Sequence, residues 1–426
     1  MSDNTALLLA EDEGAALSSD EMRRWRALPA RQQPDWLDDP QLESVREHLS
    51  TRPALVTRDE VATLRALLAE VAQGRFQVLQ AGDCAEDPAE CAAGPVSRKA
   101  DLLDELAEVM RSRSGRPVLR VGRIAGQFAK PRSRPVELVG GRELPVYRGH
   151  MVNRPEPDDR ARRPVPSWMA ACYDAAAVAV DALRLRGTGE AMGPYAHVWT
   201  SHEALVLDYE LPLLRRDRDG RLLLTSTHWP WIGERTRQAD GAHVRLLASV
   251  DNPVACKVGP SADTDDLVRL CSLLDPDRTP GRLTLIARMG ADAVTERLPA
   301  LVAAVRAAGH PVSWLSDPMH GNTVNAPGGM KTRHVDSIVR EVVGFQDAVA
   351  AAGGVAGGLH LEATPYDVTE CVADASRADG LDGAYTTLCD PRLNPWQALE
   401  VVSAWHDRDR RRTTTAHMTR GEEFRR

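Results

Sequence analysis

The pattern of hydrophobic and polar positions divides the chain into two kinds of segment that alternate. Short apolar runs that end in polar residues are separated by longer segments in which apolar residues recur at helical spacing. Strands that alternate with helices predict parallel βαβ units, and eight of them predict an α/β fold, the (β/α)8 TIM barrel. The predicted strands are residues 77–80, 118–121, 196–200, 228–232, 254–258, 283–287, 312–315 and 358–361. The predicted helices are residues 99–111, 167–185, 264–274, 295–308, 335–352 and 395–407.

The N-terminal part of the chain departs from this alternation. Its first fifty or so residues are polar and broken by prolines, which predicts an extension that packs on the main body or on a partner subunit. A helix follows, with Thr57 and Glu60 at the spacing of a capping box and Gly74 at its end. We therefore assign the chain to an N-terminal extension with its helix, for packing or oligomerisation, a catalytic barrel and a polar C-terminal tail, at residues 1–70, 71–410 and 411–426.

The main irregular segment of the chain is 131–166, which contains several prolines, a Gly-Gly pair and many arginines. A loop of this length in a compact domain is usually a lid or a binding loop, with a solvated surface excursion as the alternative.

Composition and charge limit the classes of function. Hydrophobic residues make up 43% of the 426 positions, so the chain can build a sizeable core. The net charge of -8 argues against nucleic-acid binding. Seven scattered cysteines without a Cys-x-x-Cys pair argue against a disulfide framework and favour a reduced, cytoplasmic setting. The N-terminus lacks a basic segment before its short apolar run, so we expect neither a signal peptide nor a membrane span.

Polar clusters follow nearly every predicted strand. In a barrel the catalytic groups lie at the carboxyl ends of the strands, so clusters in register predict an active site there. The clusters lie at residues 82–86, 122–133, 201–203, 233–237, 257, 288, 317–322, 362 and 390–392.

One subset of these residues is cationic. Any single cation among them would most simply pair with a neighbouring carboxylate or lie exposed on the surface. As a set on an acidic chain, they predict one or two substrates with several negative charges, because arginine and lysine match phosphate and carboxylate oxygens. The cations are Arg123, Lys130, Arg132, Arg235, Lys257, Arg288 and Lys331.

A second subset has the donor atoms of a metal site: Cys84, His320, Glu362 and Asp390. One thiolate, one imidazole and two carboxylates suit a divalent ion such as Mn²⁺, Co²⁺, Fe²⁺ or Zn²⁺. Their spacing matches no local metal motif, and an isolated cysteine or histidine is usually structural. The barrel favours a metal site because it brings all of them to one rim. Cys389 adjoins Asp390, and we hypothesise that it forms a disulfide with Cys84 under oxidation.

The polar clusters belong to longer motifs that resemble one enzyme family. QAGDCAE, VGRIAGQFAKPRS, TSHEALVLDYE, WIGERTRQ, NPVACKVGPS, DPMHGNT, HLEAT and CDPRLN are similar to motifs of the class II, plant-like 3-deoxy-D-arabino-heptulosonate 7-phosphate (DAHP) synthases. The resemblance runs from about Trp25 to about Trp405. It implies a transferase that condenses phosphoenolpyruvate with erythrose 4-phosphate and water to give DAHP and phosphate, the first step of the shikimate pathway to chorismate and the aromatic amino acids.

The resemblance implies a role for each matching residue. The predicted donors fall on the family's ligands for a divalent ion, Mn²⁺ or Co²⁺ first and Fe²⁺ or Zn²⁺ as alternatives. Lys130 is the candidate to protonate the new alkoxide or hydrogen-bond to it, and Glu203 or Glu234 to orient the attacking water. The phosphoenolpyruvate site corresponds to Arg123, Glu234, Arg235, Lys257 and Arg288. The aldose phosphate and the reaction centre meet at Lys130, Arg132 and Ser133, with Lys331 as a further candidate.

The chain also departs from the family pattern. Ala81 replaces a usual glycine, and His150 replaces what is more often an acidic residue. The segment between the PRS and GERTR motifs is short, which resembles the short form of the family associated with secondary metabolism. This implies weak or absent inhibition by Phe, Tyr and Trp. The resemblance also implies a homo-oligomer, dimer or tetramer, with chorismate mutase as a candidate partner.

Three alternatives remain open from the sequence. The chain could make the amino analogue of DAHP for an aminohydroxybenzoate pathway, or it could be a catalytically silent regulatory homologue. Lys257 could instead form a Schiff base on the same barrel, as in metal-free aldolases.

Overall fold

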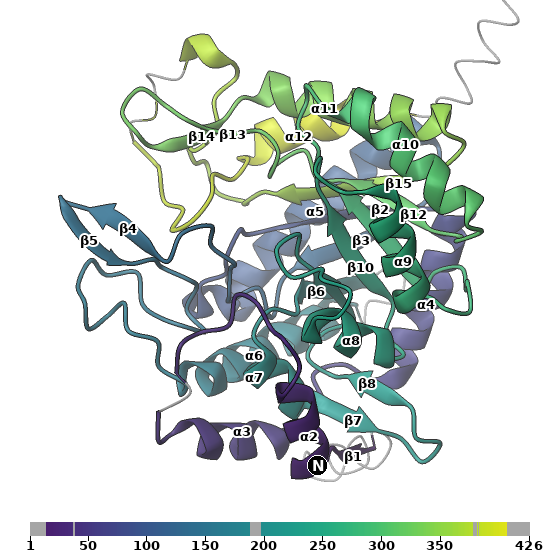
Figure 1. Cartoon of the computed structure of the whole chain (residues 1–426). Helices are drawn as coiled ribbons and strands as arrows, with labels where there is room; N and C mark the ends of the chain where they lie inside the picture. The colour runs from purple at the N-terminus through teal and green to yellow at the C-terminus, as the bar shows by residue number, and fades with distance from the viewer. Residues whose placement is uncertain (1–13, 37–38, 188–196, 378–380, 382, 407–426) are drawn as a thin grey trace, which may run out of the picture.

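A closed barrel of parallel strands forms the centre of the molecule (Figure 1). The structure is a computed structural model that describes residues 14–36, 39–187, 197–377, 381 and 383–406. Around the barrel the strands follow the order β10-β11-β12-β15-β2-β3-β6-β9. Their bounds are β2 (Gln77–Gly82), β3 (Val118–Arg123), β6 (Val198–Glu203), β9 (Trp229–Ile232), β10 (Val254–Val258), β11 (Leu283–Ala287), β12 (Ser313–Ser316) and β15 (Val355–Glu362). Each overlaps one predicted strand, which confirms the predicted fold; Ala196, the start of the third prediction, lies outside the described residues.

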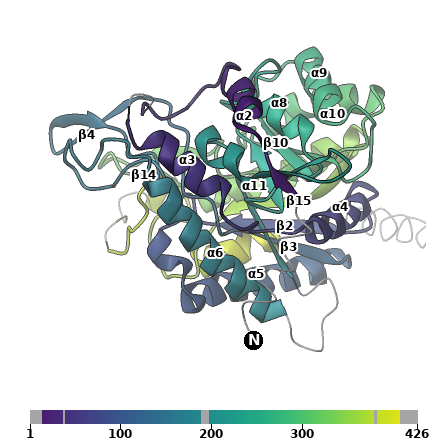
Figure 2. The same ribbon diagram turned by 90° about the horizontal axis from the view of Figure 1, so that it is seen from below.

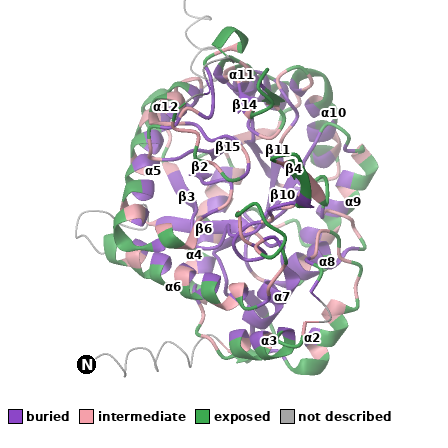
Figure 3. Cartoon of the chain, turned by 90° about the vertical axis from the view of Figure 1, so that its left-hand side faces the viewer, coloured by how far each residue is buried: buried purple, intermediate pink, exposed green. Residues whose placement is uncertain are grey.

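Helices surround this barrel and turn their buried faces toward it (Figure 3). They are α5 (Ala93–Ser114), α6 (Trp168–Gly187), α8 (Ala242–Ser249), α9 (Thr264–Leu274), α10 (Val294–Ala307), α11 (Val335–Ala351) and α12 (Pro395–Ser403). Each predicted helix overlaps one of them, while α8 was not predicted and the predicted end at Asp407 lies outside the described residues. The shorter elements are η1 (Pro88–Cys91), α7 (Leu207–Glu210), η3 (Leu211–Leu213), η4 (Ala375–Arg377) and the hairpin β7 (Leu214–Arg216) and β8 (Leu222–Leu224). None of the described helices has both the length and the apolarity needed to cross a membrane.

Helix α4 (Arg58–Ala72) closes the amino end of the barrel. Its buried residues Leu64, Leu68 and Val71 pack in one cluster with residues from inside the barrel, among them Trp199 and Trp229. The predicted capping box at its start is confirmed, since Thr57 N donates to Glu60 Oε2 at 2.7 Å and Glu60 N donates to Thr57 Oγ1 at 3.2 Å.

Glu60 also joins α4 to α6. Arg184 donates to both Glu60 oxygens, at 3.0 and 2.8 Å, and His228 Nε2 lies 3.6 Å from Glu60 Oε2. Burial alone would raise the pKa of Glu60, but His228 and Arg184 outweigh burial and lower the pKa below its usual value.

We expect Glu60→Gln to lower the free energy of unfolding by roughly 1 kcal/mol at pH 7, because glutamine can keep the cap but loses the ion pair with Arg184. A carboxyl whose folded pKa is depressed stabilises the fold above its unfolded pKa, here 4.5, and this contribution is lost as pH falls toward the folded value. Urea denaturation from pH 7 to pH 3 should therefore show the difference between wild type and variant shrinking below about pH 4.5. Glu70→Gln, on the same helix, removes an ion pair with the exposed Arg75 and should change the free energy of unfolding little. A pH-independent difference at Glu60 would contradict this account.

The N-terminal extension packs on the barrel body (Figure 2). It contains β1 (Ala15–Ala16), which pairs with β7, and the helices α2 (Ser19–Arg26) and α3 (Leu42–Ser50). Trp36 Nε1 donates to Asp208 Oδ2 at 3.0 Å, and Arg46 Nη2 lies 2.6 Å from Asp208 Oδ1. The domain boundaries at residues 70 and 410 stay predictions, and the predicted tail at 411–426 lies outside the described residues.

The segment 131–166 is not wholly irregular. It contains the hairpin β4 (Val136–Val139) and β5 (Arg142–Pro145), which turns at Gly140 and Gly141 with φ of 55° and 79°. Such angles suit glycine, so the Gly-Gly pair was the sequence signal for this hairpin. A second hairpin, β13 (Thr323–Asn325) and β14 (Lys331–Arg333), follows β12.

Candidate active site

A pocket of about 670 Å³ lies at the carboxyl ends of the barrel strands. Both hairpins contribute to its wall, through Leu138 of β4 and Asn325 of β13. Most of the predicted site residues line it: Lys130, Arg132, Ser133, Glu203, Glu234, Arg235, Lys257, Arg288, His320, Lys331 and Asp390. Cys84, Arg123 and Glu362 lie deeper, and each is almost fully buried.

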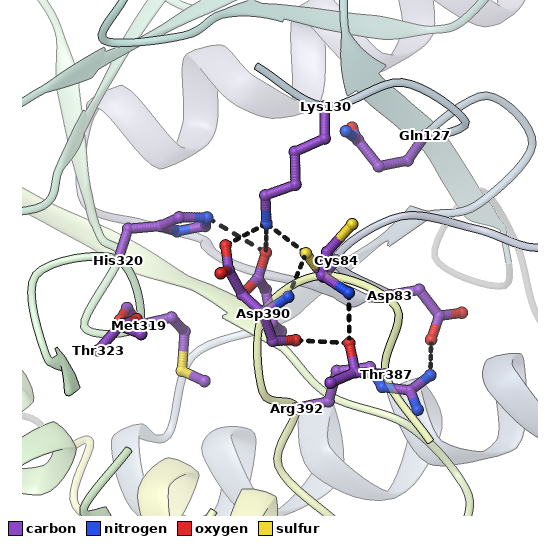
Figure 4. A network of polar contacts seen from close by, with 12 residues as sticks. Asp83, Cys84, Gln127, Lys130, Met319, His320, Thr323, Thr387, Asp390 and Arg392 are labelled. Atoms are coloured by element: carbon purple, nitrogen blue, oxygen red, sulfur yellow. Dashed lines mark hydrogen bonds and ion pairs between the residues drawn. The ribbon is translucent and has the colours of Figure 1, made fainter. Parts of the chain in front are cut away.

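The predicted metal donors converge at the base of this pocket. Donor atoms of Cys84, Glu362 and Asp390 all lie within 4.8 Å of one another, and His320 Nε2 lies 3.2 Å from Glu362 Oε1. Figure 4 shows three of the four side chains converging from separate loops. A thiol and two carboxylates at this spacing, with an imidazole beside one of the carboxylates, suit one divalent ion of the Mn²⁺, Co²⁺, Fe²⁺ or Zn²⁺ type.

Asp317 orients the imidazole of His320 and was not predicted to do so. Its Oδ2 lies 2.8 Å from His320 Nδ1, which leaves Nε2 directed toward Glu362. The same oxygen lies 2.9 Å from Lys257 Nζ. Burial would raise the pKa of Asp317, but His320 and Lys257 hold it well below its usual range, so the residue is a buried carboxylate. A carboxylate on the second ring nitrogen is the usual arrangement for a metal-binding histidine.

The ammonium group of Lys130 lies among the same donor atoms (Figure 4). Its Nζ is 2.5 Å from Asp390 Oδ2 and 3.6 Å from Glu362 Oε1, and it contacts Cys84 Sγ. Burial would lower the pKa of Lys130, but these acidic groups together raise it. Lys130 is therefore a protonated group next to the donor set and open to the pocket.

Arg123 supports the site from below. Its guanidinium donates to Asp83 O at 2.9 Å, lies 2.7 Å from His360 Nε2 and 3.1 Å from Glu362 Oε1. These contacts tie β2, β3 and β15 together under the pocket. Its predicted contact with substrate stays a prediction, because Arg123 is not part of the pocket wall.

Glu203, the last residue of β6, presents a partly buried carboxyl to the pocket. Its N–H donates to Gln127 Oε1 at 2.9 Å. A Cβ added at Gly233 would lie 2.0 Å from Glu203 Oε1, so the carboxyl occupies space that glycine alone leaves open. Burial raises the pKa of Glu203, while Lys257 and Lys130 oppose the shift. A carboxyl whose pKa is raised in this way holds a proton more readily than an exposed one, which suits a role in proton transfer.

The remaining cations line the wall of the pocket. Arg288 Nη2 donates to the carbonyl of His320 at 2.7 Å, and Lys331 Nζ lies 2.7 Å from Asp390 Oδ1. Arg235 is an exposed residue of the wall. They surround the donor set with positive charge, as the sequence predicted.

Glu234 holds the turn after β10 at Gly259 in addition to lining the pocket. Gly259 N donates to Glu234 Oε2 at 2.7 Å, and Arg237 Nη2 donates to Glu234 Oε1 at 3.0 Å. The carboxylate is thus held by donors on two loops, which favours a role in fixing the wall.

Arg333 was not predicted from the sequence, although it stands two positions after Lys331. It is fully buried, its Nη1 lies 2.8 Å from Glu362 Oε2, and its Nε donates to Thr323 Oγ1 at 3.0 Å. The sequence signal was the short basic run itself, but which cation reaches Glu362 depends on the fold. Cys389 packs with Cys84 and Tyr147 in one buried cluster, and the disulfide hypothesis stays a prediction.

Comparison with known sequences places the chain among the members of one family. The sequence profile described as the Class-II DAHP synthetase family matches residues 20–193 and 186–404. The "Probable phospho-2-dehydro-3-deoxyheptonate aldolase" of Pseudomonas fluorescens is 54% identical over 91% of this chain and 97% of its own length. The phospho-2-dehydro-3-deoxyheptonate aldolase of Streptomyces coelicolor is 40% identical over 89% of this chain and 95% of its own. A solved structure of the Francisella tularensis aldolase of the same name covers 87% of this chain and 96% of its own, at 13% identity and a TM-score of 0.49.

Proposed function

The chain belongs to the class-II DAHP synthetase family, and from this premise we propose that its pocket condenses phosphoenolpyruvate with erythrose 4-phosphate and water. The products are DAHP and inorganic phosphate, which makes the protein a transferase at the entry to aromatic biosynthesis. The observation that carries the proposal is the pocket itself, in which a metal-type donor set stands inside a wall of cations.

The cations bind the two substrates, which together bring two phosphates and a carboxylate. Lys257, Arg288 and Arg235 suit phosphoenolpyruvate, because they come from neighbouring strand ends beside the donor set. Arg132 and Ser133 suit the phosphate of the aldose at the outer side of the pocket. Neutralising these charges lets two anions approach within reacting distance.

The bond-forming step joins the methylene carbon of phosphoenolpyruvate to the aldehyde carbon of the aldose. The chemistry that a bound divalent ion supplies here is polarisation of the aldehyde oxygen, and Cys84, His320, Glu362 and Asp390 would hold that ion. Lys130 delivers a proton to the developing alkoxide from its place among the donors. Glu203 orients the water that adds to the former enol carbon and accepts its proton, after which phosphate leaves.

Two finer points follow from the same residues. Mn²⁺ or Co²⁺ is the proposed ion, because a mixed thiolate, imidazole and carboxylate set suits borderline metals. A reducing, cytoplasmic setting is proposed because Cys84 must stay a free thiol to bind it. The Schiff-base alternative is less well supported, because Asp317 Oδ2 pairs with the Lys257 ammonium at 2.9 Å.

The test is an assay of phosphoenolpyruvate loss on chelator-treated protein given erythrose 4-phosphate, with and without Mn²⁺ or Co²⁺. We expect consumption to return with the metal and one phosphate to be released per heptulosonate formed. No turnover with any divalent ion would overturn the proposal. Turnover with the amino analogue of the aldose alone would favour the aminohydroxybenzoate branch instead.

A further inference from the structure

The N-terminal extension contacts the loop that contains Arg132 through Gln32. The side-chain Oε1 of Gln32 accepts the backbone N–H of Arg132 at 2.9 Å, across 100 positions of sequence. The carbonyl of the same residue accepts a hydrogen bond from Arg148 Nη2. One residue outside the barrel thus holds both the loop that begins at Lys130 and the segment that follows β5.

The backbone of Gln32 adopts an unusual conformation to make these contacts. Its φ is +62°, in the left-handed region that non-glycine residues rarely occupy. Such conformations persist where surrounding contacts hold them and are concentrated at functional sites. Here the left-handed turn allows the carbonyl and the side chain of Gln32 to serve two different partners.

The neighbouring residue Gln33 anchors this turn to the barrel. Its Nε2 donates to the carbonyl of Leu205 at 2.8 Å, and its Oε1 accepts Leu207 N at 3.0 Å. Arg148 Nη1 donates to the carbonyl of Gln33 at 3.1 Å, and the carbonyl of Arg148 accepts Lys130 N at 2.9 Å. The turn is therefore fixed on one side to the loop after β6 and on the other to the backbone of Lys130.

The loop that contains Arg132 has few backbone donors with which to hold its own conformation. Pro131 and Pro135 lack an N–H, so two of its residues cannot donate a backbone hydrogen bond. The side chain of Arg132 is held by Glu137 of β4 at 3.3 Å, which is part of a hairpin rather than of the barrel. Gln32 supplies the acceptor that ties the backbone of Arg132 to the body of the protein.

We propose that Gln32 is a positioning residue that places Arg132 for the phosphate group of the aldose substrate. The inference rests on the proposed function for the identity of that ligand. It gives the N-terminal extension a role in the site in addition to packing. It also explains why a strained conformation is retained in a segment otherwise remote from the strand ends.

The test compares wild type with Gln32→Ala, Gln32→Gly and Gln32→Glu. Both truncations remove the acceptor, and we expect each to raise the KM for erythrose 4-phosphate about ten-fold, with the KM for phosphoenolpyruvate within about two-fold. Glycine suits a φ of +62°, so Gln32→Gly should melt at least as high as Gln32→Ala yet show the same KM defect. Gln32→Glu keeps an acceptor oxygen at the same reach and should restore the wild-type KM.

A second measurement is independent of turnover. Hydrogen exchange followed by mass spectrometry on the peptide that contains Arg132 should show its amide exchanging about ten-fold faster in both truncations and protected in Gln32→Glu. Unchanged exchange, or a KM defect shared equally by both substrates, would overturn the inference. A wild-type protein that makes no heptulosonate would refute the proposed function instead, and the exchange result would still decide whether Gln32 fixes the loop.

Discussion

Lys130→Met is expected to lower kcat by about 10³-fold, because removing a positioned general acid costs about 10²- to 10⁴-fold in rate. Methionine has a similar length and fills the same buried space, so the loss is chemical rather than steric. Lys130→Arg should recover little of the rate, because a planar guanidinium keeps the positive charge but cannot occupy the place of the compact ammonium group among the donor atoms. Steady-state kinetics with both substrates at saturating metal would measure the effect.

The matched control for this prediction is Arg134→Met, an exposed cation of the same pocket wall. It should change KM rather than kcat, because Arg134 does not reach the donor set through any contact of the described residues. Metal content must be measured for both variants, since Lys130 touches Cys84 and Asp390. A Lys130→Met protein with full metal content and wild-type kcat would exclude the proposed proton donor.

Cys84→Ala is expected to weaken Mn²⁺ binding by at least about 100-fold and to reduce turnover to background at micromolar metal. The thiol lies within 4.8 Å of the Glu362 and Asp390 donor atoms, so its removal leaves a site of fewer ligands. Metal binding would be followed by calorimetry on chelator-treated protein, which needs no activity. Excess metal should restore part of the rate, since the other predicted ligands remain.

Cys172→Ala is the control for that experiment. Cys172 is a buried free cysteine on α6 and belongs to the main hydrophobic core rather than to the donor set. Its removal should leave Mn²⁺ affinity and kcat near the wild-type values. Equal loss of metal from both variants would mean that packing, and not ligation, accounts for the effect at Cys84.

The barrel could be predicted because its strands are continuous apolar runs between helical patterns. The bounds of β10 and β11 match their predictions, since both strands are buried on both faces and end at a charged residue or a glycine. The helices α2 and α3 were not predicted, because both are short and most of their residues are polar. In α3 only Leu42, Val45 and Leu49 are buried. Weak local patterns of this kind become helices only when packing selects them.

The sequence predicted many of the residues that lie at the site but not which of them contact one another. The motifs pointed to Cys84, Glu362 and Asp390 as donors, and the structure brings these three together. Asp317 lies three positions before the histidine that it contacts, in the same loop, but whether this aspartate holds the imidazole depends on the conformation of that loop. The role of Gln32 could not be predicted, because it depends on a contact between segments 100 positions apart that no local pattern encodes. Long-range partners of this kind are fixed by topology, and the sequence shows only that polar residues are available.

The seam between β2 and β15 has a consequence for how the protein is made. These strands are neighbours in the barrel, yet His360 and Gln80, which face each other across it, are 280 positions apart. During synthesis the barrel cannot close until β15 has left the ribosome. Until then the edge of β2 that pairs with β15 has no partner, and unpaired strand edges promote aggregation. Cys84 and Glu362 lie at the two sides of this seam, and their site is therefore completed only when the ring closes. A nascent chain that ends before β15 would therefore have an open barrel and would lack Glu362, so its donor set would be incomplete.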